Sequence, residues 1–342
     1  MLVVMQEGAT EGQIQAVIDR LVSLSFTVHR STGVVHTVLG GVGPAELSDP
    51  RDFEVMEGVQ EARRIMSPYK LASRHFRPGG TVVKIGEVEV GGDQVVVMAG
   101  PCSVENRDQV MRIAERVAQA GAKVIRGGAF KPRTSPHEFQ GLGLEGLKIL
   151  REASQLTGLP VVTEVMDTRL VEQVAEYADM LQIGSRNMQC YPLLVEVGRT
   201  HKPVLLKRGM AASLVEWLGA AEYIAKEGNL DIVLCERGIK TYPSGEYSRY
   251  SLDLSVIQAL REETFLPVIV DPSHGTGVAA MVEPASRAAV EFGADGLLIE
   301  VASSQPSASP PKCDAAQAIA PEQLQSIVEF AHAHQPRVAQ SK

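Results

Sequence analysis

The sequence predicts an α/β protein in which a (β/α)8 TIM barrel follows a small ferredoxin-like domain. The chain has 342 residues, which is room for about two domains. From residue 94 onward, eight short runs rich in β-branched residues alternate with amphipathic helical stretches, and such alternation over about 250 residues is typical of a parallel barrel. The first 66 residues instead have the order β-α-β-β-α-β, which is the split arrangement of ferredoxin-like domains.

The N-terminal domain is expected at residues 1–66. Apolar residues at helical spacing indicate the helices, and short β-branched runs indicate the strands. In chain order, we expect a strand at 2–5, a helix over 14–22, strands at 26–29 and 34–38 around a turn at 31–33, a short helix near 51–57 and a strand near 59–66. A domain of this size can hardly form a deep catalytic site, so we predict that it regulates the larger domain or holds subunits together.

The barrel is expected at residues 81–342, after a linker at 67–80 that is marked by Ser, Pro and Gly. A short hairpin over 81–92 should precede the first barrel strand. The barrel strands are expected at 95–99, 123–126, 161–165, 180–183, 204–207, 232–235, 268–270 and 296–301. An open doubly wound sheet is the alternative, but its first strand usually leads into a G-x-G-x-x-G turn, which residues 100–104 do not match.

The composition excludes several classes of protein. Hydrophobic residues make up 44% and charged residues 22% of the chain, which is ordinary for a globular protein and argues against disorder. There is no apolar run of about 18 residues that could span a membrane, and the N-terminus lacks the features of a signal peptide. With four cysteines we predict a reduced, cytoplasmic protein. The net charge of −8 argues against a nucleic-acid partner.

Lysine or arginine follows five of the eight predicted strands. One such charge often marks only the point where a strand meets water, but five in an acidic protein suggest a common purpose. Since the carboxyl ends of barrel strands meet on one face, these cations should converge on anions such as phosphates and carboxylates. The cations are Arg126, Lys131, Arg133, Arg186, Lys207, Arg208 and Arg237.

A second group of strand-end residues has the chemistry of metal ligands. Cys102, His274 and Glu300 end the first, seventh and eighth strands, which are neighbours in a closed barrel, and Asp314 lies beyond. A thiolate, an imidazole and carboxylates together suit a divalent ion such as Mn, Fe, Co or Zn. The other three cysteines have no comparable neighbours in the sequence, and we expect them to be structural: Cys190, Cys235 and Cys313.

Six motifs together resemble the type I family of 3-deoxy-D-arabino-heptulosonate 7-phosphate (DAHP) synthases, in the form with an N-terminal ferredoxin-like domain. They are GPCSVE at 100–105, GGAFKPRTS at 127–135, IGSRNMQ at 183–189, LLKRG at 205–209, LCERG at 234–238 and VDPSH at 270–274. The KPRT run distinguishes the chain from the sister family, the 3-deoxy-D-manno-octulosonate 8-phosphate synthases that use arabinose 5-phosphate, which remain the alternative. The cysteine at position 102 resembles the metal-dependent enzymes, because metal-free members of the sister family have Asn at this position.

The resemblance implies a metal-dependent condensation of phosphoenolpyruvate with D-erythrose 4-phosphate and water, the first step of the shikimate pathway of aromatic amino acid biosynthesis. It places the carboxylate of phosphoenolpyruvate on Arg126, Lys131 and Lys207 and its phosphate on Arg186 and Arg237. The same resemblance assigns the erythrose 4-phosphate group to Arg133 and Thr134, the metal to Cys102, His274, Glu300 and Asp314, and catalytic roles to Lys131, Glu164 and His274.

The segment after Glu300 departs from the family pattern. The usual Val-His-x-x-Pro is replaced by Val-Ala-Ser-Ser-Gln-Pro, and the Ser/Pro-rich loop that follows is longer than in the family. Asp314 is therefore the least secure of the four ligands, with Cys313 or a water as alternatives.

The resemblance also implies that the N-terminal domain binds phenylalanine or tyrosine and closes over the mouth of the barrel. We expect the protein to be a homotetramer. The alternative is a domain that only stabilises the tetramer. Two further functions remain open for the barrel: a non-catalytic binder of phosphorylated ligands, and an aldolase that forms a Schiff base, which needs a desolvated lysine away from other cations.

Overall fold

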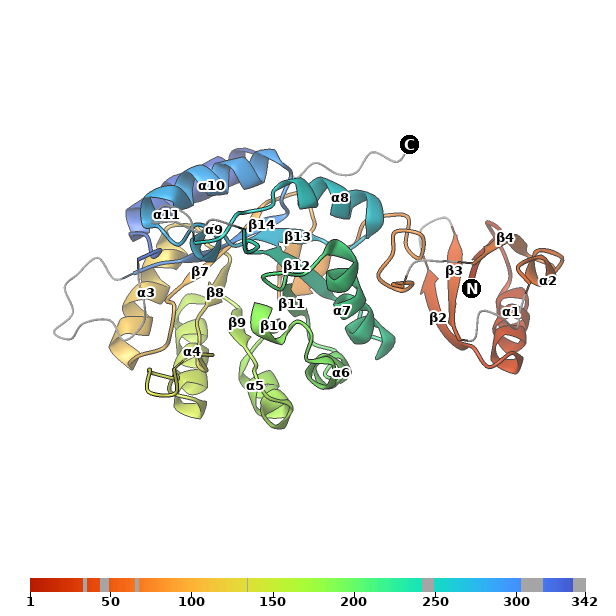
Figure 1. The fold of residues 1–342 in the computed structure, drawn as a ribbon, viewed down its shortest axis with the longest axis horizontal. Helices are drawn as coiled ribbons and strands as arrows, with labels where there is room; N and C mark the ends of the chain where they lie inside the picture. The colour runs from red at the N-terminus through yellow and green to blue at the C-terminus, as the bar shows by residue number, and fades with distance from the viewer. Residues whose placement is uncertain are drawn as a thin grey trace.

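The computed structural model describes residues 1–32, 36–43, 49–64, 68–133, 135–241, 249–302 and 316–334. It confirms the predicted α/β architecture, with a closed barrel of parallel strands in the order β7-β8-β9-β10-β11-β12-β13-β14 and a separate sheet in the order β2-β3-β1-β4. Figure 1 shows the barrel within its ring of helices and the small sheet to one side of it. None of the described helices is long and apolar enough to cross a membrane.

The N-terminal domain has the predicted order of elements. They are β1 (Leu2–Met5), α1 (Glu11–Ser23), β2 (Thr27–Thr32), β3 (Thr37–Val42), α2 (Arg51–Glu54) and β4 (Val59–Arg63). Thr10 begins α1 as a capping box with Gln13, which satisfies two backbone donors at the helix start. One face of the sheet packs against α1 and α2 through Leu39, Leu21 and Phe53. Part of the strand expected at 34–38 lies outside the described residues, and α2 is a single turn.

The barrel strands agree with the expected runs to within a few residues. They are β7 (Val96–Gly100), β8 (Val124–Arg126), β9 (Val161–Glu164), β10 (Met180–Ile183), β11 (Val204–Lys207), β12 (Ile232–Glu236), β13 (Val268–Val270) and β14 (Gly296–Glu300). The helices that follow are α3 (Arg107–Gln119), α4 (Leu144–Thr157), α5 (Val171–Tyr177), α6 (Tyr191–Arg199), α7 (Leu214–Lys226), α8 (Ser255–Glu263), α9 (Pro272–Thr276), α10 (Ala279–Glu291) and α11 (Pro321–Ala333).

A hairpin of β5 (Val83–Ile85) and β6 (Val88–Val90) closes the base of the barrel. Val83, Ile85 and Val90 are fully buried and form one cluster with the side chains that fill the barrel interior, among them Met98 and Cys235. Burial raises the pKa of the Cys235 thiol, which fits a cysteine that serves only packing. Because the hairpin occupies the amino ends of the strands, a ligand can enter only at the carboxyl ends.

The segment expected as a linker is packed against the barrel. Tyr69, Leu71 and Phe76 are buried. The carboxylate of Glu222 on α7 accepts the backbone N–H groups of Leu71 and Ala72 at 3.0 and 2.9 Å. The Tyr69 hydroxyl donates to Glu263, at the end of α8, at 2.7 Å. These contacts attach the segment near the base of the barrel, since α8 ends just before β13 begins.

The N-terminal sheet rests on this packed segment with the face that its helices leave free. Leu2 and Val38 share a buried cluster with Leu71 and Phe76. Gly40 allows the close approach, because a Cβ atom there would lie 2.8 Å from the Phe76 ring. The small domain is therefore held at the side of the barrel base, as Figure 1 shows.

Candidate active site

A pocket of about 580 Å³ opens where the carboxyl ends of the barrel strands meet. Nine of the twelve predicted site residues line it: Cys102, Arg126, Lys131, Arg133, Glu164, Arg186, Lys207, Arg237 and His274. Glu300 lies directly behind His274, whereas Thr134 and Asp314 lie outside the described residues. The described lining comes entirely from residues 102–317, so no described residue of the N-terminal domain lines this pocket within one chain.

Arg208 was expected among the converging cations, but it points away from them. Its guanidinium pairs with Glu236 at 3.0 Å and Asp253 at 2.9 Å, and its Nε donates to the carbonyl of Ala212. Successive side chains of a strand point to opposite faces, so Lys207 faces the pocket and Arg208 faces the helices.

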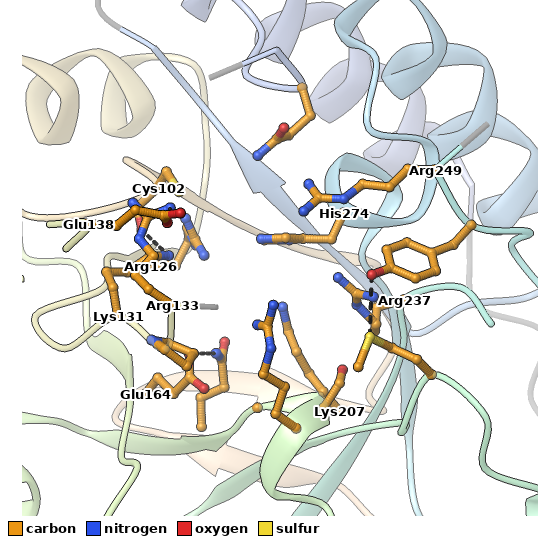
Figure 2. Close-up of a pocket in the computed structure, with 18 residues that line it drawn as sticks. Cys102, Arg126, Lys131, Arg133, Glu138, Glu164, Lys207, Arg237, Arg249 and His274 are labelled. Carbon is orange, nitrogen blue, oxygen red and sulfur yellow. Dashed lines mark hydrogen bonds and ion pairs between the residues drawn. The ribbon is translucent and has the colours of Figure 1, made fainter. Parts of the chain in front are cut away.

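The pocket has a large excess of positive charge. Seven lysine or arginine residues line it against two glutamates, Glu138 and Glu164. In Figure 2, Arg237 and Arg249 lie across the cavity from Lys131 and Arg133. The cations thus surround the space from several sides, an arrangement that attracts multiply charged anions.

Asp271 is fully buried and organises two of the pocket residues. Its carboxylate accepts Lys207 Nζ at 2.5 Å and faces His274 Nδ1 at 2.6 Å. It also accepts the backbone N–H of His274 at 2.9 Å, which caps the short helix α9. Burial opposes ionisation, but His274 and Lys207 outweigh it and hold the pKa of Asp271 well below its usual range.

Glu300 likewise orients pocket residues, on the other side of His274 from Asp271. It accepts Arg126 Nη1 at 3.0 Å and Gln317 Nε2 at 2.6 Å, and it lies 3.2 Å from His274 Nε2. Burial would raise the pKa of Glu300, but the nearby His274 and Arg126 lower it. Burial in turn lowers the pKa of His274 despite its two acidic neighbours.

Glu164 is the buried carboxyl group at the floor of the pocket. Loss of hydration raises its pKa, although Lys131, Lys207 and other cations oppose the rise. Gly184 leaves room for this side chain, because a Cβ atom at Gly184 would lie 1.9 Å from Glu164 Oε1. A glutamate with a raised pKa can hold or release a proton near neutral pH.

Three arginines that line the pocket, Arg186, Arg237 and Arg249, have no acidic partner among the described residues. Among the described residues, no carboxylate forms an ion pair with Arg186 or Arg237, whereas Arg126 and Lys207 are paired. Arg237 Nη1 and Ser185 Oγ are buried without a hydrogen-bond partner in the described part of the chain. A buried donor without a partner is costly, which makes both groups candidates to contact a bound anion.

Four further residues line or organise the pocket without a role predicted from the sequence: Asp271, Ser185, Tyr250 and Gln317. A sequence pattern could have predicted the role of Asp271, because an aspartate three residues before His274 and directly after a strand has the spacing of a helix cap. No such pattern marks Tyr250, since it does not follow the end of a strand.

Three of the four residues proposed as metal ligands are described by the structure, but they do not form a complete metal-binding site in it. His274 Nε2 and Glu300 are adjacent, and Cys102 lines the same pocket. Across the described ranges, no group of three or more His, Cys, Asp or Glu side chains is arranged to hold a metal. The donor chemistry fits a divalent ion, since a carboxylate on Nδ1 turns Nε2 of a histidine toward a metal.

Comparisons with known proteins agree with this geometry. A family model described as the DAHP synthetase I family matches residues 72–339, and one described as the DAHP synthase ferredoxin-like domain matches residues 1–67. The chain belongs to the DAHP synthetase I family. The family resemblance of the sequence motifs is thereby confirmed, and enzymes of this family are generally metal-dependent.

The relatives separate the two candidate reactions. The phospho-2-dehydro-3-deoxyheptonate aldolase of Thermotoga maritima is 46% identical over 88% of this chain and 88% of its own length. A crystal structure of the T. maritima DAHP synthase has a TM-score of 0.74 and 43% identity, covering 96% of this chain and 95% of that one. The 2-dehydro-3-deoxyphosphooctonate aldolase of Syntrophotalea carbinolica is 33% identical over 72% of this chain and 93% of its own. The heptulosonate reaction is therefore favoured over the octulosonate one.

We predict that Glu164→Gln stabilises the ligand-free protein at alkaline pH. The folded-state pKa of Glu164 is raised, so its contribution to stability is fully present below the unfolded pKa and is lost as pH rises through the folded pKa. Thermal unfolding should show the variant melting roughly 2–4 °C higher at pH 8.5, with the difference shrinking toward pH 5. A variant that is less stable at pH 8.5 would contradict the burial of an ionised carboxylate.

Proposed function

We propose that this chain condenses phosphoenolpyruvate with D-erythrose 4-phosphate and water to give DAHP and inorganic phosphate. The observation that carries the proposal is the surplus of cations in one pocket, seven against two glutamates. Two phosphate groups and a carboxylate are the anions that such a pocket needs. Because the two substrates repel each other in solution, the first contribution of the protein is to hold them side by side.

Phosphoenolpyruvate is assigned to the centre of the pocket. Its phosphate goes to Arg186 and Arg237, which have no acidic partner in the described part of the chain and can offer bidentate hydrogen bonds. Its carboxylate goes to Arg126, Lys131 and Lys207. Arg133, with Thr134, is the proposed site for the phosphate of erythrose 4-phosphate.

In the proposed reaction, C3 of phosphoenolpyruvate attacks the aldehyde carbon of erythrose 4-phosphate and forms the new C–C bond. Positive charge develops at C2, water adds there, and the C2–O bond to phosphate breaks. Lys131, whose ammonium group donates to the carbonyl of Cys102 at 2.9 Å, protonates the developing alkoxide. Glu164 orients the water and takes its proton, a role that suits a carboxyl group with a raised pKa. Surrounding donors stabilise the charges as they form.

A divalent ion, Mn, Fe, Co or Zn, is the proposed cofactor, with Cys102, His274, Glu300 and Asp314 as its ligands. When bound, it supplies a Lewis acid that polarises the aldehyde. Asp271 supports this assignment, because it holds His274 through Nδ1 and leaves Nε2 facing Glu300.

We predict phosphate release from phosphoenolpyruvate and erythrose 4-phosphate in the presence of Mn, and little from phosphoenolpyruvate and arabinose 5-phosphate. Arg186→Leu should raise the KM for phosphoenolpyruvate about 10- to 100-fold, because a charge-assisted contact is lost. Arg199→Leu, an exposed residue on α6, is the control. Binding of either substrate without turnover would favour the non-catalytic alternative, and inactivation by borohydride would favour a Schiff base.

A further prediction concerns the metal. Cys102→Ser should lose bound metal and about 100-fold of activity in excess Mn, because a thiolate ligand is replaced by a weaker hydroxyl. Cys190→Ser is the matched control, since Cys190 is a free cysteine outside the pocket. Metal content by atomic absorption and activity would be measured together, and values at the wild-type level for Cys102→Ser would refute the ligand assignment.

The N-terminal domain is proposed to bind phenylalanine or tyrosine and to inhibit the barrel. We predict that a protein lacking residues 1–66 condenses the substrates but is insensitive to both amino acids. Equal inhibition of the intact and truncated proteins would leave the domain with the structural role only.

We also propose that the protein is a cytoplasmic homotetramer without nucleic-acid or membrane partners. The acidic net charge of −8 and the family resemblance support this proposal.

A further inference from the structure

Tyr250 lines the pocket and contacts Arg237, one of the three pocket arginines without a carboxylate partner in the described ranges. Arg249, another of the three, lies farther from the same ring, at 5.9 Å. The guanidinium carbon of Arg237 lies 4.4 Å from the centre of the Tyr250 ring. The Tyr250 hydroxyl donates to Sδ of Met210 at 3.3 Å. The ring therefore has a defined position between a loop that follows β11 and a guanidinium that follows β12.

The backbone around Tyr250 is firmly held. Ser251 and Ile239 exchange two backbone hydrogen bonds of 3.0 and 2.9 Å, and the N–H of Tyr250 donates to the carbonyl of Gly275 at 3.2 Å. Gly238 makes the necessary room: its φ is +90°, and a Cβ atom there would lie 2.6 Å from Cβ of Tyr250. The segment thus ties the loop that carries Arg237 to the helix that carries His274.

The way in which Arg237 is held differs from that of its neighbours. Arg126 and Lys207 are fixed by Glu300 and Asp271, so part of their charge is already compensated. An aromatic ring attracts a guanidinium through its quadrupole without supplying a negative charge. Arg237 is nine-tenths buried, and its Nη1 has no hydrogen-bond partner among the described residues, so its charge stays available to a ligand.

We propose that Tyr250 is a positioning residue that holds Arg237 in place for a phosphate group while leaving its charge uncompensated. This inference rests on the proposed function, in which Arg237 binds the phosphate of phosphoenolpyruvate. An acidic residue at the same place would also fix Arg237, but it would compete with the phosphate for the guanidinium. Tyr250 orients the Arg237 guanidinium, and the neutralisation of its charge is left to the phosphate.

The Tyr250 hydroxyl also forms a hydrogen bond with Arg237, so the test compares Tyr250→Leu, which removes both ring and hydroxyl, with Tyr250→Phe, which keeps the ring alone. Tyr250→Leu should raise the KM for phosphoenolpyruvate about 5- to 30-fold, with a smaller change in kcat and in the KM for erythrose 4-phosphate. Tyr250→Phe should restore most of the affinity. Tyr191→Leu, an exposed tyrosine on α6, is the matched control and should change neither constant.

A double-mutant cycle with Arg237→Leu decides whether Tyr250 acts through Arg237. In the Arg237→Leu background, loss of the ring should have almost no further effect on KM. An equal effect in both backgrounds would overturn the proposal, as would an unchanged KM in Tyr250→Leu alone. If Arg237→Leu instead raises the KM for erythrose 4-phosphate, the substrate assignment above fails, while the cycle still reports the coupling of the two residues.

Should Tyr250→Leu not fold, phenylalanine analogues with one to three ring fluorines at position 250 supply the test, with Tyr250→Phe as their reference. Fluorination weakens the ring quadrupole stepwise, so the KM for phosphoenolpyruvate should rise with each fluorine. A KM that does not depend on fluorination would show that the ring does not attract Arg237 and would refute the proposal.

Discussion

The buried carboxylate of Asp271 is the constraint on which the pocket depends. It lies at the end of β13 and simultaneously caps α9, faces Nδ1 of His274 and accepts the ammonium of Lys207. Removing a carboxylate from water costs free energy, so it is buried only where charged and polar partners replace the lost hydration. The same bonds orient the histidine toward Glu300 and fix the lysine at the pocket, so one residue positions both the expected metal ligand and an expected substrate contact.

The pocket divides its cations into two sets with different roles. Arg126 and Lys207 have carboxylate partners at 3.0 and 2.5 Å, which keep them ordered in the absence of a ligand. Arg186 and Arg237 have none among the described residues, so their charge is left for the anion that binds. A pocket built in this way is costly to fold when empty and gains the missing interactions when an anion binds.

The two domains are connected through packing and not through a loose tether. Leu71 and Phe76 are buried between the free face of the small sheet and the barrel base, and the hairpin β5–β6 closes the same end. Both features lie at the amino ends of the strands, opposite the pocket. Any effect of the N-terminal domain on the reaction therefore has to travel through the barrel or arise between subunits.

The sequence by itself determined the (β/α)8 barrel, the order of elements in the N-terminal domain and the family, because strand and helix periodicity and six local motifs are properties of neighbouring residues. It also placed nine pocket residues at strand ends, since a closed barrel brings those ends to one face. Only the tertiary structure showed that Arg208 faces the helices, that Asp271 connects Lys207 with His274 and that Tyr250 lies against Arg237. These facts depend on side-chain direction and on contacts between loops far apart in the chain, which no local pattern encodes.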